Sequence, residues 1–106
     1  FATNVILYVL ALNKLNISDK FLSIVTGDMV EKGKPDPAIF LLAAKNIDTD
    51  PNECLVIEDG ISGMLAAKNA NMKCIGLVKT IDYDKYPTIN QILSLREMDM
   101  DYLKSL

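Results

Sequence analysis

Hydrophobic positions along this chain change repeatedly between two spacings, one typical of helices and one typical of strands. Apolar residues about one helical turn apart predict helices at 5–15, 38–47, 61–70 and 98–106. Short apolar, β-branched runs predict strands at 21–26, 54–57, 72–78 and 91–93, and residues 1–2 look like the tail of another strand. Helices that alternate with strands predict an α/β fold, with a mostly parallel sheet and helices on its faces.

Capping and turn residues mark the boundaries of these elements. Asp36-Pro37 predicts a helix start, because an acidic N-cap followed by proline suits the first helical turn. Thr3 or Asn4 can cap the helix at 5–15 in the same way. Asn71 is expected in the left-handed conformation that ends many helices. The polar stretch 79–90 predicts irregular structure.

Composition narrows the class of protein. The chain has 106 residues, half of them hydrophobic, which suits one small packed domain. A net charge of −3 argues against nucleic acid and anionic membranes as partners. No apolar run approaches the ~20 residues that span a bilayer. Because the chain opens inside an apolar segment without an initiating Met, we expect it to be part of a longer protein.

Cysteine and histidine usage points to the compartment and to the chemistry. Cys54 and Cys74 each begin an apolar run, so we expect both to be reduced core residues of a cytoplasmic protein. The sequence has no histidine, which excludes histidine-based catalytic triads and metal sites with histidine ligands. Acid–base chemistry would therefore fall to carboxylates or to a lysine.

The stretch Val56-Ile57-Glu58-Asp59-Gly60 is the most informative part of the sequence. An apolar strand ends there in two adjacent carboxylates, at the edge where parallel α/β sheets place their chemistry. Neighbouring carboxylates repel each other unless a cation lies close, and Mg²⁺ takes oxygen ligands. Solvated loop acids are the simpler explanation of this pair taken alone.

Two more polar residues are predicted at strand ends, Thr3 and Lys34. Taken singly, Thr3 could be only a helix cap, Lys34 a loop lysine between Gly33 and Pro35, and Asp59 a turn acid. Together they suit a phosphoryl group, because a hydroxyl can bind phosphate oxygens, a lysine can neutralise phosphate, and an acid can hold Mg²⁺.

With these residues in place, residues 1–78 resemble the haloacid dehalogenase (HAD) superfamily, in its β-phosphoglucomutase/phosphoglycolate phosphatase-like branch. The resemblance rests on two stretches, one from Val25-Thr26-Gly27-Asp28 to Gly33-Lys34-Pro35-Asp36-Pro37 and one from Val56 to Ala70. Spacing agrees too: 31 positions separate Thr3 from Lys34, and 25 separate Lys34 from Asp59. The resemblance implies a Rossmann-like parallel sheet with helices on both faces.

The resemblance also implies roles for individual residues. Thr3 matches the hydroxyl that binds the transferred phosphoryl group, with Asn4 beside it. Lys34 matches the lysine that bridges phosphate and nucleophile. Asp59, assisted by Glu58, matches the Mg²⁺ ligand. Gly60 and the Ser62-Gly63 pair match a turn that lets the next helix approach closely. Relatives in this family transfer phosphoryl groups through an aspartyl-phosphate.

Two parts of the family pattern are missing from the sequence. The nucleophile and general acid of the family belong to an Asp-x-Asp motif that follows a strand well upstream of the motif matched by Thr3. The helical cap that selects substrates is usually inserted before the motif matched by Thr3. Asp48-Thr49-Asp50 and Asp99-Met100-Asp101 contain such strings, but neither follows a β-rich run, so we expect neither to act. We expect residues 1–106 to be the carboxyl-terminal part of the core domain.

Loss of the nucleophile strand has a structural consequence. In the family fold it lies between the strand that ends at Thr3 and the strand that ends at Asp59. Without it the sheet would split and leave two unpaired edges. We therefore expect these residues not to fold stably alone.

Several functions are compatible with these patterns. The leading hypothesis is a Mg²⁺-dependent phosphatase or phosphomutase for a small phosphorylated metabolite, monomeric when complete, with its nucleophile outside this chain. A haloacid dehalogenase in the strict sense fits less well, because those enzymes need no metal. A receiver-like binding domain would place Asp before Thr and Lys, whereas the order here is Thr3, Lys34, Asp59. A degenerate family member that acts as a scaffold is the remaining alternative.

Overall fold

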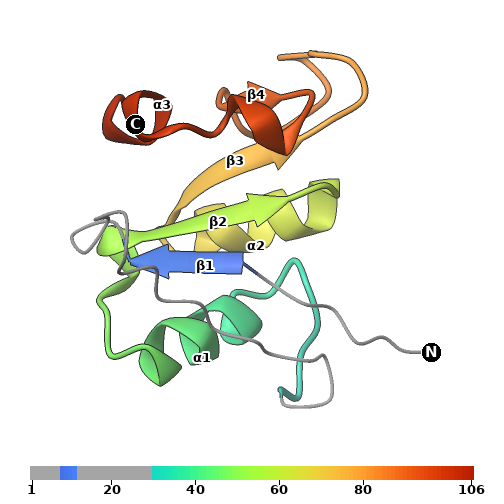
Figure 1. The fold of residues 1–106 in the computed structure, drawn as a ribbon. Coiled ribbons are helices and arrows are strands. Elements are labelled where there is room, and N and C mark those ends of the chain that lie inside the picture. Colours follow the sequence, from blue (N-terminus) through green and yellow to red (C-terminus); the bar gives the residue numbers. More distant parts are fainter. Residues whose placement is uncertain (1–7, 12–29) are drawn as a thin grey trace.

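A computed structural model describes residues 8–11 and 30–106, with backbone only for 8–11. Figure 1 shows a four-stranded sheet with helices on either side. The strands are β1 (Tyr8–Ala11), β2 (Cys54–Glu58), β3 (Lys73–Leu77) and β4 (Gln91–Ile92). The helices are α1 (Ala38–Asn46), α2 (Ile61–Asn69) and α3 (Met100–Lys104), with short 3₁₀ turns η3 (Pro51–Glu53) and η4 (Leu95–Glu97). From residue 38 onward the order of helices and strands agrees with the sequence prediction. Their bounds agree within one residue, except that α3 begins two residues later and ends two residues earlier than predicted.

The sheet is mostly parallel, as predicted. Its strand order is β1-β2-β3-β4, and both the β2–β3 and the β3–β4 pairs are parallel. Helix α2 makes the crossover from β2 to β3, the usual way to join two parallel neighbours. The carboxyl ends of β2 and β3 therefore meet at one edge of the sheet, where the acid pair follows β2.

Strand β1 corrects the prediction of a helix over 5–15. Tyr8–Ala11 instead pair antiparallel with β2, with Tyr8 opposite Ile57 and Ala11 opposite Cys54. A buried strand needs partners for its backbone N–H and C=O groups on both edges, and β3 satisfies only one edge of β2. The run around Tyr8 and Val9 also favours extended backbone. Edge pairing therefore prevails over the helical spacing of the apolar residues.

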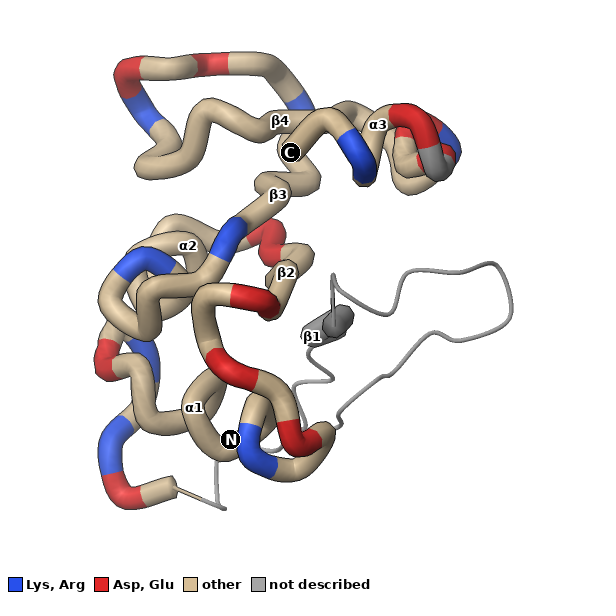
Figure 2. The backbone as a smooth tube through the Cα atoms, turned by 90° about the vertical axis from the view of Figure 1, so that its left-hand side faces the viewer, with Lys and Arg blue, Asp and Glu red and all other residues tan. Residues whose placement is uncertain are grey.

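Two apolar clusters pack against opposite faces of the sheet. On one face, alternate residues of β2 and β3, such as Cys54, Val56 and Cys74, are buried with residues of α1 and α2. On the other face, Leu55 and Ile75 are buried with residues of β4 and α3. Figure 2 shows α1 and α2 on one side of the strands and α3 on the other. The helices cover both faces, as predicted, and both free cysteines lie in the core.

Helices α1 and α2 end in the same hydrogen-bonded motif. After α2, Asn71 has a φ of 62°, and the N–H groups of Asn71 and Met72 donate to the carbonyls of Lys68 and Ala67. This is a Schellman ending with asparagine in the place that usually falls to glycine, as predicted. Asp48, with a φ of 50°, ends α1 in the same way.

The remaining carboxyl-terminal region also follows the prediction. Residues 79–90 form turns and bends without a helix or strand, and α3 begins after Asp99, whose Oδ1 accepts from the N–H of Tyr102 at 2.8 Å. None of the helices in residues 30–106 is long and apolar enough to cross a lipid bilayer.

Candidate functional site

Glu58 is the centre of the polar contacts at the end of β2. Its side chain is only 6% exposed, although it carries a carboxylate. Oε2 accepts from the ammonium of Lys34 at 3.1 Å. Oε1 accepts from the backbone N–H groups of Asp59 and Gly60, at 3.1 and 3.3 Å. Both carboxylate oxygens are thus engaged, which is how a buried charge is normally stabilised.

Gly63 makes room for this carboxylate in the first turn of α2. A Cβ added at Gly63 would lie 2.0 Å from Cδ and 2.1 Å from Oε2 of Glu58. Real Cβ atoms do not approach other heavy atoms so closely, so any other residue at this position would force Glu58 or α2 to move. The family resemblance implied that Gly63 lets a neighbouring part of the chain approach α2 closely. In the structure the group that approaches Gly63 is the carboxylate of Glu58.

Lys34 reaches Glu58 from a loop that is fixed on both sides. Before α1, the N–H of Asp36 donates to the carbonyl of Gly33 at 3.0 Å, and Asp36 Oδ1 accepts from the N–H of Ala38 at 2.9 Å. The N-cap of α1 is Pro37, one residue later than predicted, and Asp36 instead holds the N–H of Ala38 from just before the cap. Asn69, at the end of α2, donates through Nδ2 to the carbonyl of Pro35 at 3.1 Å. No pattern in the sequence indicates this link between α2 and the loop that carries Lys34 (residues 30–37, the lysine loop).

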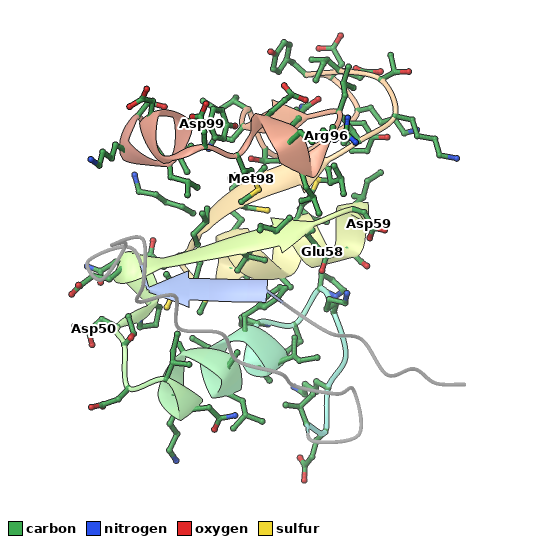
Figure 3. All side chains as sticks on the ribbon, viewed as in Figure 1. Asp50, Glu58, Asp59, Arg96, Met98 and Asp99 are labelled. Atoms are coloured by element: carbon green, nitrogen blue, oxygen red, sulfur yellow. The ribbon has the colours of Figure 1, made fainter. Side chains whose placement is uncertain are left out.

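Asp59 follows Glu58 directly but has different surroundings. Its side chain is exposed, and within residues 30–106 no hydrogen bond or ion pair engages its carboxylate. It lines a cavity of about 780 Å³ together with residues after β3 and around η4, Lys79 and Arg96 among them. Figure 3 shows Asp59 and Arg96 at the end of the sheet where β2 finishes. This carboxylate is open to a ligand.

The two acids fit a magnesium site unequally. Mg²⁺ commonly binds proteins through one or two carboxylates and keeps several waters. Asp59 offers an open carboxylate, whereas Glu58 already shares its oxygens with Lys34 and two amides. No group of three or more potential metal-binding side chains occurs among the described residues. The described residues therefore fit only part of a magnesium shell, to which the open carboxylate of Asp59 could contribute one ligand.

The two Asp-x-Asp strings lie away from this site. Asp50 precedes η3 and the amino end of β2, so it lies at the other end of that strand from Asp59 (Figure 3). Asp99 caps α3 on the opposite face of the sheet from α1 and α2. Neither string follows a strand directly, which agrees with their exclusion from the sequence alone.

The predicted site residues are thus partly brought together. Lys34 and Glu58 are in contact, and Asp59 adjoins Glu58. Thr3 and Asn4 lie outside the described residues, as does the predicted strand at 21–26. Asn69 and Arg96 were not recognised from the sequence, because a polar residue on a helix or in a loop carries no distinctive pattern of its own.

The spacing of Lys34 and the acid pair matches that of a known protein family. The family model for haloacid dehalogenase-like hydrolases matches residues 8–77, more than half of the chain. The chain belongs to this family. The predicted resemblance is confirmed, and the HAD match covers both Lys34 and the acid pair.

Curated relatives in the HAD family include phosphatases and a mutase. The Bacillus subtilis protein named "Putative phosphatase YhcW" is 39% identical over 99 residues, which cover 87% of this chain and 43% of that protein. Beta-phosphoglucomutase from the same organism is 46% identical over 66 residues, or 62% of this chain and 29% of the enzyme. The chain therefore spans less than half the length of these relatives.

Solved structures give the same family and fold. The crystal structure of beta-phosphoglucomutase from Clostridium difficile matches with a TM-score of 0.65 and 33% identity, over 89% of this chain and 41% of that one. CbbY from Rhodobacter sphaeroides in complex with xylulose-(1,5)-bisphosphate matches with a TM-score of 0.62 and 30% identity, over 73% of this chain and 36% of that one. The α/β fold predicted from sequence is confirmed as a HAD fold.

Proposed function

We propose that this protein is a Mg²⁺-dependent phosphoryl-transfer enzyme, a phosphatase or phosphomutase acting on a small phosphorylated metabolite. The observation that carries the proposal is the contact between Lys34 and Glu58 beside the open carboxylate of Asp59. This arrangement offers a cation for phosphate and an acid for metal at the carboxyl edge of a parallel sheet. Phosphatases and a phosphoglucomutase among the relatives support it.

Lys34 binds and orients the phosphoryl group in this proposal. An ammonium has three N–H donors, and Glu58 accepts from one of them, which leaves two for phosphate oxygens. The side chain is 19% exposed, so it is held by packing but still reachable. Glu58 acts as a positioning residue for Lys34, and its two amide contacts keep its own carboxylate in place.

Asp59 would hold Mg²⁺, with Glu58 close behind it. Bound there, Mg²⁺ would neutralise charge on the phosphoryl oxygens. Thr3 and Asn4, which precede β1 in the sequence, are proposed to bind phosphate. We propose that an aspartate outside these 106 residues is the nucleophile that forms the aspartyl-phosphate, since Asp50 and Asp99 lie away from Glu58 and Asp59 (Figure 3). We also propose that the protein works in the cytoplasm, because both thiols are free.

Hydrolysis of p-nitrophenyl phosphate by the full-length protein tests this function. Lys34→Ala is expected to lower kcat by about 10²-fold or more, because it removes the cation aimed at the phosphoryl group. Lys32→Ala is the matched control, since Lys32 is an exposed lysine of the same loop without an ion pair in residues 30–106. Equal activity of the two variants would remove Lys34 from the mechanism. A full-length protein without Mg²⁺-stimulated hydrolysis would instead favour the scaffold alternative.

Asp59→Ala tests the metal assignment separately. The half-saturating Mg²⁺ concentration for hydrolysis should rise by about tenfold or more, because the variant lacks the open carboxylate. Asp84→Ala is a suitable control, because Asp84 is also exposed but does not line the cavity. An unchanged Mg²⁺ titration in Asp59→Ala would reject Asp59 as a ligand.

A further inference from the structure

The cavity beside Asp59 is basic, although the chain as a whole is acidic. Three cationic side chains line it, those of Lys79, Lys85 and Arg96, against the carboxylates of Asp59 and Asp82. The whole chain carries a net charge of −3. The loop between β3 and β4 carries Asp82 and Asp84 between Lys79 and Lys85 (Figure 2). An excess of cations around a concave surface raises the local concentration of anions.

The carboxylates do not cancel this charge by pairing with the cations. The only ion pair within residues 30–106 is that of Lys34 with Glu58. Asp82 Oδ1 instead accepts from the backbone N–H groups of Asp84 and Lys85, both at 3.0 Å. Lys85 Nζ lies 5.1 Å from the ring centroid of Tyr86, a cation–π contact that orients it but leaves its charge. The three cations are therefore open to an external anion.

Hydrogen bonds fix the loop that carries Lys79 and Lys85. Gln91 Oε1 accepts from the N–H of Asp82 at 2.8 Å. Gln91 Nε2 donates to the carbonyls of Asp82 and Thr88, at 3.2 and 2.7 Å. The side chain of Gln91 on β4 thus holds two points of this loop, Asp82 and Thr88, against the sheet. The wall formed by this loop is consequently held in place without a helix or strand of its own.

A capping box fixes the opposite wall. Ser94 Oγ accepts from the N–H of Arg96 at 3.2 Å, and Glu97 Oε2 accepts from the N–H groups of Leu93 and Ser94, at 2.7 and 3.0 Å. These bonds form η4 and present Arg96 at the cavity. They also occupy the carboxylate of Glu97, a nearby acid that could otherwise have paired with Arg96.

We propose that this cavity binds a phosphate dianion separate from the phosphoryl group held at Lys34. Arginine and lysine together provide several charge-assisted hydrogen bonds for phosphate oxygens. Asp59 lies in the cavity wall, so a cation bound to Asp59 would make the cavity still more positive. The phosphate belongs either to the part of the substrate that is not transferred or to free inorganic phosphate. Only the first source rests on the proposed function.

Titration with inorganic phosphate, followed by amide NMR shifts of the full-length protein without Mg²⁺, tests the binding. Lys34→Ala removes the catalytic cation, so shifts that persist at 79–97 in that variant report the cavity. Arg96→Gln should weaken these shifts, raising the Kd by about tenfold, because it removes charge-assisted donors. Lys79→Gln should act in the same direction. Lys104→Gln on α3, which removes an exposed charge that does not line the cavity, should leave the Kd within about twofold.

Two results would overturn the site. One is the absence of shifts at 79–97 in both the wild type and Lys34→Ala. The other is an equal effect of Arg96→Gln and Lys104→Gln, which would show only general attraction to positive charge. Failure of the proposed function appears differently, as absent hydrolysis while phosphate still binds in the cavity.

Kinetics of Arg96→Gln separates the two sources. If the cavity holds a second phosphate of the substrate, KM for a ketose bisphosphate should rise by about tenfold. KM for p-nitrophenyl phosphate, which has one phosphate, should not change. If the ligand is free phosphate, both KM values should stay the same while the Kd for phosphate at 79–97 rises. A rise in both KM values would place Arg96 at the transferred phosphoryl group and contradict a separate site.

Discussion

Glu58 and Asp59 are neighbours in the chain, yet they belong to two different regions of the molecule. Glu58 lies in a packed region between β2, α2 and the lysine loop, with partners for both oxygens. Asp59 lies on the wall of an open cavity, and within residues 30–106 no hydrogen bond or ion pair engages its carboxylate. The difference shows that two adjacent acids of one motif have different surroundings, since one holds a lysine and the other lines a cavity.

The larger expected effect on stability comes from removing Glu58. Glu58→Ala leaves the ammonium of Lys34 and two backbone N–H groups without their acceptor. Because the pair is largely buried, we expect a loss of about 2–4 kcal/mol in the free energy of unfolding. Asp59→Ala should change the free energy of unfolding by no more than about 0.5 kcal/mol, because the Asp59 side chain is exposed and makes no hydrogen bond or ion pair within residues 30–106. Urea denaturation of the full-length variants gives both values.

Glu58→Gln sharpens the same test. Glutamine keeps an oxygen that can accept from the Asp59 and Gly60 amides but removes the charge opposite Lys34. Its destabilisation should therefore lie between those of Asp59→Ala and Glu58→Ala. Equal stability losses for Glu58→Ala and Asp59→Ala would contradict the division between a packed and an open acid.

Gly63→Ala disturbs the packed region from the other side. The new Cβ would overlap the carboxyl group of Glu58, so either this side chain or α2 has to shift. Overpacking of this kind should destabilise the protein by about 1–3 kcal/mol and displace Lys34 with its partner. Thermal unfolding and hydrolysis of p-nitrophenyl phosphate by the full-length variant measure the two effects.

Gly60→Ala is the matched control for this overlap. The nearest atom to a Cβ at Gly60 is Glu58 Oε1, at 3.9 Å, an ordinary contact distance. Its backbone has a φ of −113°, which any residue adopts. We expect nearly unchanged stability and turnover. A Gly63→Ala variant as stable and active as Gly60→Ala would show that Glu58 can lie elsewhere without loss.

The packed region could be predicted from sequence far better than the open one. Lys34, Glu58 and Gly63 belong to motifs whose spacing follows from a strand, a turn and a helix that must fit together. Arg96 and Gln91 were not found, because their roles depend on how a loop without regular structure folds over the sheet. Local sequence patterns therefore predict the residues at the centre of the site but not the loop residues that surround it.

Strand β1 shows a different limit of sequence reasoning. The apolar residues around Tyr8 have helical spacing, but the free edge of β2 decides their backbone conformation. Whether β2 has an unpaired edge depends on the assembled sheet, so the residues around Tyr8 cannot by themselves predict that they will pair with it. Without the nucleophile strand the sheet is expected to split and leave unpaired edges, but residues 8–11 pair with the free edge of β2 in one four-stranded sheet.

The smallest effect concerns the core thiols and appears only at alkaline pH. Burial, with a smaller contribution from the charge of Glu58, raises the pKa of Cys74 to about 12. Burial and the nearby Glu53 and Asp50 raise the pKa of Cys54 to about 11. Unfolding exposes both thiols to water, where they ionise above about pH 9. The unfolded state then binds fewer protons than the folded state, so stability falls as pH rises from 9 towards 11.

Cysteine substitution separates the contribution of the thiols to this loss of stability from the contributions of other groups that titrate at high pH. Each thiol should contribute about 1 kcal/mol to the loss between pH 8 and pH 10. Cys74→Ala should therefore show a shallower fall over this range than the wild type, whatever its stability at pH 8. A thiol reagent should modify neither cysteine in the folded full-length protein but should modify an introduced Thr80→Cys on the cavity wall quickly. Rapid modification of Cys74 would show that the packed region opens as readily as the cavity, which would remove the contrast between the surroundings of Glu58 and Asp59.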